Sequence, residues 1–377
     1  MPLDSLEIRI SLQRLLAALI VILVPITVFG FYIGLHADKQ VHQMNGAYFR
    51  TITRSAALTT SDFIGQRVTA ASLIANEPSL VQAVTVANRS YEHMGESEIR
   101  ARADRVESNW NSSESDPLAT NILTSDLARW LRRCRELNPT LLKITVADQT
   151  GATVAATDKP VHYFQTEREY WQTLDSRSEG SVHISDVRYD EQSRSNYISI
   201  GFPVLQEGSG RFIGAVTALV DVSPLFTYLN QQQIARSGRV FLIKDDGTVV
   251  NSPGVSPSMR VKADEYTAIR DALGTLQGRE TGYVDARLPN GENYLIGFAD
   301  TGLKQAYPNL GWIVVATQDE REAFGPILNM AHFALLMMIL GVLMLTLLGA
   351  YVFLHQKQQL SDLEPPAEEE RPRGTAA

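Results

Sequence analysis

The sequence contains a single cysteine, Cys134, so no disulfide can form within one copy of the chain. A fold of this size must therefore be stabilised by its hydrophobic core, which several hundred residues can supply. The seven histidines are scattered, and neither an HExxH nor a CxxC motif supports a zinc site. A nucleophile elbow, a Walker loop and a glycine-rich dinucleotide turn are also absent. We therefore expect that the protein is not an enzyme and that it binds neither a metal nor a cofactor.

An excess of positive charge is absent as well. The formal net charge is −8, which argues against nucleic acid as a partner. The sequence does contain two long uncharged runs, Leu15–Leu35 and Phe333–Leu354. At about 1.5 Å per helical residue, each run is roughly 30 Å long, which is the thickness of the hydrocarbon core of a bilayer. The runs therefore predict two transmembrane helices.

The first run is long for the apolar segment of a signal peptide, and no Ala-x-Ala cleavage site follows it. We interpret it as an uncleaved anchor, with a signal peptide as the alternative. Arg9 and Arg14 precede this run and Lys357 follows the second, whereas Lys39 and Arg321 lie between the runs. Because positive residues accumulate in cytoplasmic segments, this distribution slightly favours cytoplasmic termini and an extracytoplasmic central region.

A helical pattern follows the first run. Across Val41–Arg89, apolar residues recur at helical spacing, with few glycines and one proline, Pro78. The pattern predicts one long helix that acts as a stalk or dimerisation element in its first half and packs on the domain in its second. A loop at 112–117 and a second helix across Asp126–Leu137 are predicted next.

A repeat organises the rest of the polar region. The alternating segment Leu142–Ala147 passes through a turn at Gly151 into a return strand, which predicts a hairpin. A similar hairpin has its glycine at Gly247, 96 residues later, and the strand at Gly214 recurs 97 residues later at Gly311. Two landmarks with nearly the same offset predict a tandem duplication of a module of about 95 residues. The expected fold class is α+β, with helices against antiparallel sheets.

This order of anchor, stalk helix, two PAS-like modules and second anchor resembles the double Cache sensor domains of bacterial chemoreceptors, sensor kinases and cyclase receptors. The residues that carry the resemblance are Ile144–Gly151, Arg168-x-Tyr170-Trp171, Ile184–Asp186, Phe202–Val204, Gly214–Asp221 and the hairpin at Gly247. They lie within about residues 36–325. The resemblance implies a long N-terminal stalk helix and two tandem Cache modules, flanked by transmembrane helices.

The expected boundaries are 1–14 for a cytoplasmic N-terminus, 15–35 for the first transmembrane helix, 36–138 for stalk and packing helices, 139–228 for a membrane-distal module, 229–325 for a membrane-proximal module, 326–354 for the second transmembrane helix and 355–377 for a disordered cytoplasmic tail.

The resemblance also implies a ligand pocket between the sheet and the middle loops of the first module. Family members that recognise amino acids carry a Tyr, an Arg five residues later, a Trp two further on, then a Tyr and an Asp, and a final Asp on the last strand. Four positions of this pattern are met here, by Tyr163, Arg168, Asp190 and Asp221. Two positions depart from it: Tyr170 replaces the Trp, with Trp171 beside it, and Arg188 replaces the Tyr, with Tyr189 beside it.

These residue types suit a small polar ligand. A guanidinium such as that of Arg168 offers two parallel donors to a carboxylate. A carboxylate such as that of Asp221, near aromatic rings, suits an ammonium group. Arg188 would add a second cation, which favours a dicarboxylate or another anion over an α-amino acid.

Structural roles are the alternative for the same residues. Arg168 could pair with Glu167, Glu169 or Asp186 at the surface, Tyr170 and Trp171 could belong to the core, and Asp221 could cap the following helix. In the second module, Tyr283, Tyr294 and Asp300 are interpreted as structural.

The sequence therefore predicts a two-pass sensor of the bacterial inner membrane with a periplasmic central domain. It would bind an amino acid, an amine or a carboxylate and signal through its transmembrane helices to a partner membrane protein, such as a kinase, a cyclase or a chemoreceptor. The stalk would allow a homodimer. The alternatives are a membrane scaffold whose Cache pocket is degenerate, and a receptor that has lost its output domain.

Overall fold

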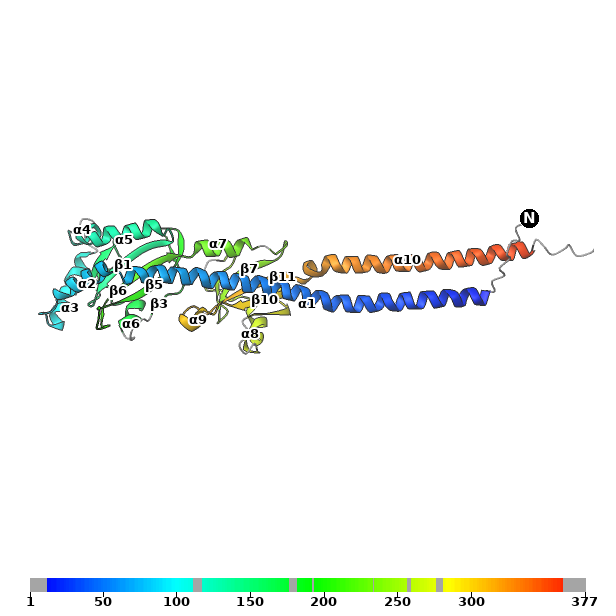
Figure 1. Cartoon of the computed structure of the whole chain (residues 1–377), viewed down its shortest axis with the longest axis horizontal. Helices are drawn as coiled ribbons and strands as arrows, with labels where there is room; N and C mark the ends of the chain where they lie inside the picture. Colours follow the sequence, from blue (N-terminus) through cyan, green and yellow to red (C-terminus); the bar gives the residue numbers. More distant parts are fainter. Residues whose placement is uncertain are drawn as a thin grey trace, which may run out of the picture. The chain divides into compact units, whose positions relative to one another are not determined.

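The computed structural model describes residues 12–110, 117–175, 182–191, 193–232, 234–255, 259–275 and 281–361. It divides into two units, one formed by the described parts of Met1–Asn45 and Ala323–Ala377 and the other by Gly46–Glu322. The first unit contains the start of α1 (Leu12–Ala75) and most of α10 (Glu320–Ser361), which run antiparallel (Figure 1). The Asn45 amide donates a hydrogen bond of 3.2 Å to the Ala323 carbonyl, and the rings of His42 and Phe324 lie 4.1 Å apart.

Within the described ranges, none of the helices combines the length and the hydropathy that crossing a bilayer requires. Most side chains of the first predicted span, Leu15–Leu35, lie outside the described residues. The two spans therefore remain predictions. Of the predicted tail, 355–361 belong to α10, and 362–377 lie outside the described residues.

The second unit contains two antiparallel sheets of matching topology, which confirms the predicted α+β fold with two modules. The strands of the first sheet are β1 (Leu141–Asp148), β2 (Thr153–Ala156), β3 (His183–Ile184), β4 (Arg188–Asp190), β5 (Ser195–Leu205) and β6 (Phe212–Asp221), in the order β2-β1-β6-β5-β3, with β4 also paired to β5. Those of the second are β7 (Arg239–Lys244), β8 (Val249–Asn251), β9 (Thr281–Arg287), β10 (Asn293–Asp300) and β11 (Trp312–Asp319), in the order β8-β7-β11-β10-β9.

The repeat predicted from the glycines corresponds to equivalent places in the two sheets. Gly151 and Gly247 turn the β1–β2 and β7–β8 hairpins with φ of 82° and 84°, a conformation that favours glycine. The strands that begin near Gly214 and Gly311, β6 and β11, both lie at the centre of their sheets. Gly291, with φ of 83°, lies in the predicted turn between β9 and β10.

The predicted single helix across Val41–Arg89 is wrong in one respect, because it is two helices. The second, α2 (Pro78–Arg89), begins at the proline, and α1 ends at Ala75. Pro78 disfavours helical backbone at the preceding residue, and Glu77 is extended with ψ of 124°.

The remaining helices are α3 (Glu96–Trp110), α4 (Pro117–Thr124), α5 (Asp126–Leu137), α6 (Glu169–Asp175), α7 (Ser223–Gln231), α8 (Tyr266–Thr275) and α9 (Leu303–Ala306). Helix α5 confirms the prediction, and the Ser125 hydroxyl caps it by accepting a hydrogen bond from the Ala128 amide at 3.1 Å. Helix α3 was not predicted. Most of the predicted loop at 112–117 lies outside the described residues.

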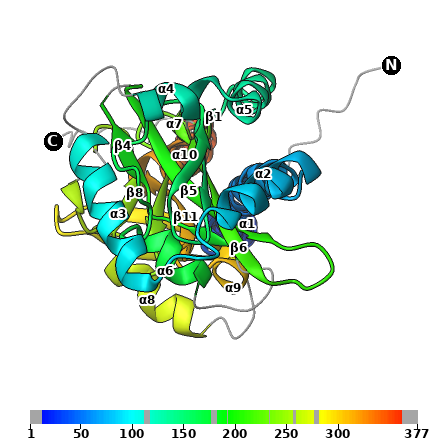
Figure 2. The ribbon, with the colours of Figure 1, turned by 90° about the vertical axis from the view of Figure 1, so that its left-hand side faces the viewer.

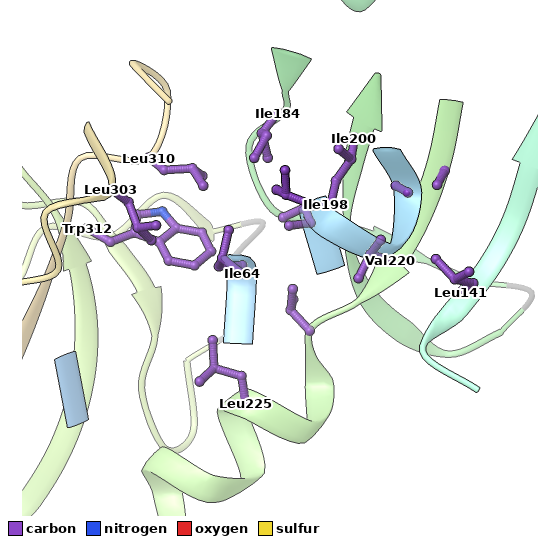
Figure 3. Packing of buried hydrophobic residues seen from close by; sticks show 14 of the residues in the cluster. Ile64, Leu141, Ile184, Ile198, Ile200, Val220, Leu225, Leu303, Leu310 and Trp312 are labelled. Carbon is purple, nitrogen blue, oxygen red and sulfur yellow. The ribbon is translucent and has the colours of Figure 1, made fainter. Parts of the chain in front are cut away.

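Helix α1 buries one continuous stripe against both sheets. The buried positions recur every three or four residues, and they include Phe49, Thr53, Ala56, Thr60, Ile64, Val68, Ala71 and Ala75. The two buried threonines satisfy their hydroxyls within the helix, because Thr53 donates to the Phe49 carbonyl and Thr60 to the Ala56 carbonyl. Ile64 lies between Trp312 of the second sheet and Ile198 of the first (Figure 3).

The two sheets differ on the face that points away from α1. In the first sheet, even-numbered residues of β1, β5 and β6 join the α1 core, which α2 and α5 also cover (Figure 2). Apart from Leu141 and Ile213, which join the core near the strand ends, odd-numbered residues of these strands face the other way, and many of them are polar. In the second sheet, the corresponding face is filled by Phe241, Ile243, Ile296, Phe298, Ile313 and Val315, with α8 packed over it. Only the first sheet therefore offers a polar face within the described residues.

We predict that Gly297→Ala destabilises the chain by about 1–3 kcal/mol, as overpacking does in other cores. A Cβ atom at Gly297 would lie 2.9 Å from the Phe49 Cβ and 3.1 Å from the Phe49 backbone, so β10 and α1 would have to separate. The free energy of unfolding, measured by denaturant titration of the full chain, tests this.

The matched control is Gly65→Ala on α1, where an added Cβ meets nothing within 4 Å. Replacing an unconstrained helical glycine by alanine stabilises a helix by about 0.5–1 kcal/mol. Equal effects of the two substitutions would contradict the close contact of α1 with β10.

Candidate ligand-binding site

A cavity of about 260 Å³ lies on the polar face of the first sheet. Strands β1, β5 and β6 contribute alternate side chains to its floor, namely Lys143, Thr145, Tyr197, Ser199, Thr217 and Leu219. The segment 158–161, Gln165 and the start of α6 form another wall, and β3 and β4 close a third. Gly201 allows the ring of Tyr170 to lie on β5, since an added Cβ there would come within 3.1 Å of the Tyr170 Cβ.

Four of the eight predicted site residues line this cavity: Arg168, Tyr170, Arg188 and Asp190. The other four, Tyr163, Trp171, Tyr189 and Asp221, are not among its lining residues. The pattern carried over from the family therefore comes together only in part.

Arg168 is half-buried at the entrance to α6, where its backbone carbonyl accepts a hydrogen bond from the Trp171 amide at 3.0 Å. No hydrogen bond or ion pair joins its guanidinium to any described residue. Two of the acids considered as surface partners are paired elsewhere, Glu169 with Arg188 at 3.1 Å and Asp186 with Lys244 at 2.5 Å. A guanidinium lining a cavity in this state can offer its fork of donors to a bound anion.

Each acidic side chain that lines the cavity has a basic partner. Asp158 accepts a hydrogen bond of 2.7 Å from Arg135, and Glu169 pairs with Arg188. Asp190 lies 3.6 Å from the Lys143 ammonium and accepts hydrogen bonds from the Ser193 hydroxyl and amide at 2.7 and 3.0 Å. The hydrogen bond from the Ser193 hydroxyl is the main cause of the lowered pKa of Asp190; burial opposes it, and the Ser193 amide and Lys143 add to the lowering.

Residues 37–327 match the model of the Cache domain family, dCache_1. The chain belongs to the Cache domain family. No curated protein matches it. Solved structures similar to this Cache protein include the ligand-binding domain of the Pseudomonas aeruginosa amino acid chemoreceptor PctB in complex with L-Arg, at 14% identity and a TM-score of 0.44, covering 75% of this chain and 98% of that one.

Two further Cache-like structures show comparable similarity. The ligand-binding domain of the Pseudomonas fluorescens chemoreceptor CtaA with L-serine has 14% identity and a TM-score of 0.44, covering 73% of this chain and 96% of that one. The extracellular domain of the putative histidine kinase rpHK1S-Z16 has 15% identity and a TM-score of 0.43, covering 73% and 94%.

Two aromatic residues that were predicted to bind the ligand belong to the core of the first Cache module. The Trp171 ring packs edge-on against Phe212 at 5.5 Å. Tyr163 is buried between Trp110 and Phe164, at 5.4 and 4.7 Å, and burial is the main cause of its raised pKa. Tyr189, by contrast, is 51% exposed. Trp171 thus has the core position that the alternative gave it, and Tyr163 and Tyr189 do not line the cavity either.

Asp221 ends β6 and turns the chain into α7. Its carboxylate accepts a hydrogen bond of 2.8 Å from the Ser223 amide, which is the first residue of that helix. An acidic side chain at this place satisfies a free amide at the helix start. The N-cap residue of α7 is Val222, so Asp221 accepts its hydrogen bond at the helix start from the position before the cap, and it does not line the cavity.

Sequence reasoning missed the polar residues on the sheet. Lys143, Thr145, Tyr197, Ser199 and Thr217 occupy every second position of strands that otherwise bury apolar residues. That period-2 alternation is a readable signal for a polar face. The Thr217 hydroxyl is buried in the cavity wall, where its interaction with the Tyr170 hydroxyl lowers the pKa of that phenol against the larger effect of burial.

A second, larger cavity of about 640 Å³ lies between the two Cache modules. Two ion pairs join charged side chains that line it, Lys244–Asp186 and Arg188–Glu169, and Asp246 pairs with Lys262 outside the lining. Arg188 and Glu169 line both cavities, so this ion pair separates the candidate ligand site from the cleft between the modules.

We predict that Tyr170 makes the stability of the chain sensitive to alkaline pH. Its hydroxyl donates to Gln165 at 3.1 Å, and burial raises its pKa from 10.0 to about 12. The neutral phenol therefore contributes stability that is present below pH 10 and is lost as pH rises towards 12, by about 3 kcal/mol for two pKa units.

The test compares the unfolding free energy of the wild type and Tyr170→Phe from pH 8 to pH 12. We expect the variant to lose less stability than the wild type over this range, although Tyr163 continues to contribute in both. Parallel curves would contradict burial of the Tyr170 hydroxyl in the cavity wall.

Proposed function

We propose that this Cache protein is a sensor whose first module binds a small polar solute in the cavity beside Arg168. The observation that supports it is a half-buried guanidinium that lines the cavity with no ion pair to a described residue. Burying a cation without a partner is costly, so such a group is typical of a site completed by an anionic ligand. The surrounding hydroxyls of Tyr170, Tyr197 and Thr217 would orient the rest of the solute.

We assign binding to the first module and a mechanical role to the second. The same face of the second sheet is closed by six large apolar side chains and α8, so no comparable polar floor is described there. The proposed activity is recognition of a solute, and we propose no catalytic step.

We propose that ligand binding changes the packing between the modules. The Arg188–Glu169 pair forms a wall shared by the ligand cavity and the cleft between the modules. A ligand that attracts or displaces Arg188 would alter that wall and favour one of two arrangements of the modules against α1. Because a ligand shifts an equilibrium only by its differential affinity, contacts at this pair supply the required coupling.

We further propose that the central domain is extracytoplasmic and that helices near both ends anchor the chain as a two-pass protein in the bacterial inner membrane. The two uncharged sequence runs support this, as do thirteen large apolar side chains between Phe333 and Leu354, each at least 43% exposed. The signal would pass through these helices to a partner membrane protein such as a kinase, a cyclase or a chemoreceptor.

The proposal includes a homodimer formed through α1. Tyr48, Leu58 and Leu73 are each more than half exposed, and their spacing of 10 and 15 residues brings them to one side of the helix. A membrane scaffold with a degenerate Cache pocket would use the same surface but would bind no solute, so solute binding separates the two functions.

The sensor hypothesis predicts binding that depends on Arg168. Thermal unfolding of the full chain in detergent micelles is measured against amino acids, amines and carboxylates, because a ligand of the folded state raises the unfolding temperature. Arg168→Gln removes a charged, bidentate donor and is expected to weaken the dissociation constant of any hit by about 10- to 100-fold.

Asp221→Asn is the matched control. The asparagine oxygen can still accept the hydrogen bond from the Ser223 amide, and the residue does not line the cavity. We expect it to leave the dissociation constant unchanged. The absence of a hit from all three classes would contradict the sensor function and favour the scaffold. Equal losses in the two variants would instead assign Asp221 to the ligand.

A further inference from the structure

We infer that the ligand is a small monocarboxylate without an ammonium group, carrying a neutral oxygen substituent such as a 2-hydroxy or 2-oxo group. This inference rests on the proposed function and narrows it. Its basis is the set of contacts around the cavity, in which the Arg168 guanidinium has no hydrogen bond or ion pair to a described residue and each lining carboxylate already has a cation.

The acidic groups of the cavity cannot easily serve a ligand ammonium. Asp158 is held by Arg135 and Glu169 by Arg188, and Asp190 is held by Lys143 and by two hydrogen bonds from Ser193. An α-amino acid needs a carboxylate for its ammonium group, because a buried cation without a partner is strongly disfavoured. Binding one here would require a protein ion pair to open first.

Lys143 disfavours a ligand ammonium group beside Asp190. It is on β1 and points to the cavity, as does Asp190 on β4, and their side chains are 29% and 23% exposed. The Lys143 ammonium therefore occupies, from within the protein, the electrostatic position beside Asp190 that a ligand ammonium would take. A lysine and a ligand cation beside one carboxylate would repel each other.

The positive groups argue against a second carboxylate on the ligand. Arg188, which the sequence suggested as a second cation for a dicarboxylate, is neutralised by Glu169 at 3.1 Å. The ammonium of Lys159, another lining residue, donates to the Trp110 carbonyl at 2.8 Å and lies over the Trp110 ring. Arg168, by contrast, has neither a hydrogen bond nor an ion pair from its guanidinium to a described residue, which suits one carboxylate.

The neutral lining defines the rest of the ligand. Thr145, Tyr197, Ser199 and Thr217 present polar groups along the sheet. Hydroxyls donate and accept, so they match a hydroxyl or a keto oxygen without requiring charge. A cavity of about 260 Å³ suits a compact acid.

The experiment compares matched solutes by calorimetry on the full chain in detergent micelles at pH 7. L-lactate and L-alanine differ chiefly in a hydroxyl and an ammonium group, and pyruvate and succinate test the keto group and a second carboxylate. We expect L-lactate or pyruvate to bind at least about 10-fold more tightly than L-alanine and succinate, in line with the cost of one unpaired charged group.

Lys143→Met is the decisive variant, because it frees Asp190 for a ligand ammonium. We expect the preference for L-lactate over L-alanine to shrink by about 10-fold or to reverse. Lys143→Arg retains the positive charge and should keep the preference. Lys159→Met, which removes a lining lysine whose ammonium bonds Trp110, should also keep it. Unfolding of each variant without solute establishes that it is folded.

Several outcomes would overturn this inference while leaving the sensor function intact. They are tighter binding of L-alanine than of L-lactate by the wild type, binding of another amino acid or an amine in an Arg168-dependent manner, and a preference unchanged in folded Lys143→Met. Failure of L-lactate and pyruvate to bind overturns it as well. Failure of every class of solute would instead contradict the sensor function itself.

Discussion

The structure depends on one constraint, which is that a single helix buries the same stripe against two successive sheets. Ile64 is fully buried between residues of both modules, and Gly297 brings the second sheet into contact with the helix backbone. Either sheet can move relative to α1 only by repacking this shared core from one discrete arrangement to another, because packed interiors resist continuous deformation. The helix therefore fixes which face of each sheet is apolar, and the opposite face is left to vary.

That opposite face is where the two copies of the repeat have diverged. In both sheets, strand alternation gives one set of side chains to α1 and the other set to the far side. The second copy fills its far side with residues such as Phe241 and Phe298, which adds to stability. The first copy places Lys143, Thr145 and Thr217 there instead and gives up that burial. The two copies thus differ on this side: apolar packing closes one, and a polar cavity lies on the other.

Local signals made much of the fold predictable from sequence. The hairpin glycines, the cap at Ser125 and the repeat offset each act over a few residues or recur visibly, and they located both sheets and α5. Pro78 is also a local signal, because a proline ends the preceding helix, although the apolar spacing predicts one helix across it. The site was less predictable, because its partners are distant in sequence. Nothing local indicates that Lys143 meets Asp190, or that Asp221 turns to Ser223 rather than to a ligand.

Distance in sequence also explains why only four of the eight predicted site residues line the cavity. Arg168 and Asp190 reach the cavity as the pattern implies, yet the charge that Asp190 presents to a ligand depends on Lys143, which the pattern does not include. A carboxylate with a protein ammonium beside it and one without are different binding groups, although the residue is the same. In this Cache protein, the charge that the cavity presents therefore depends on the ion pairs around it as well as on the identities of the residues that line it.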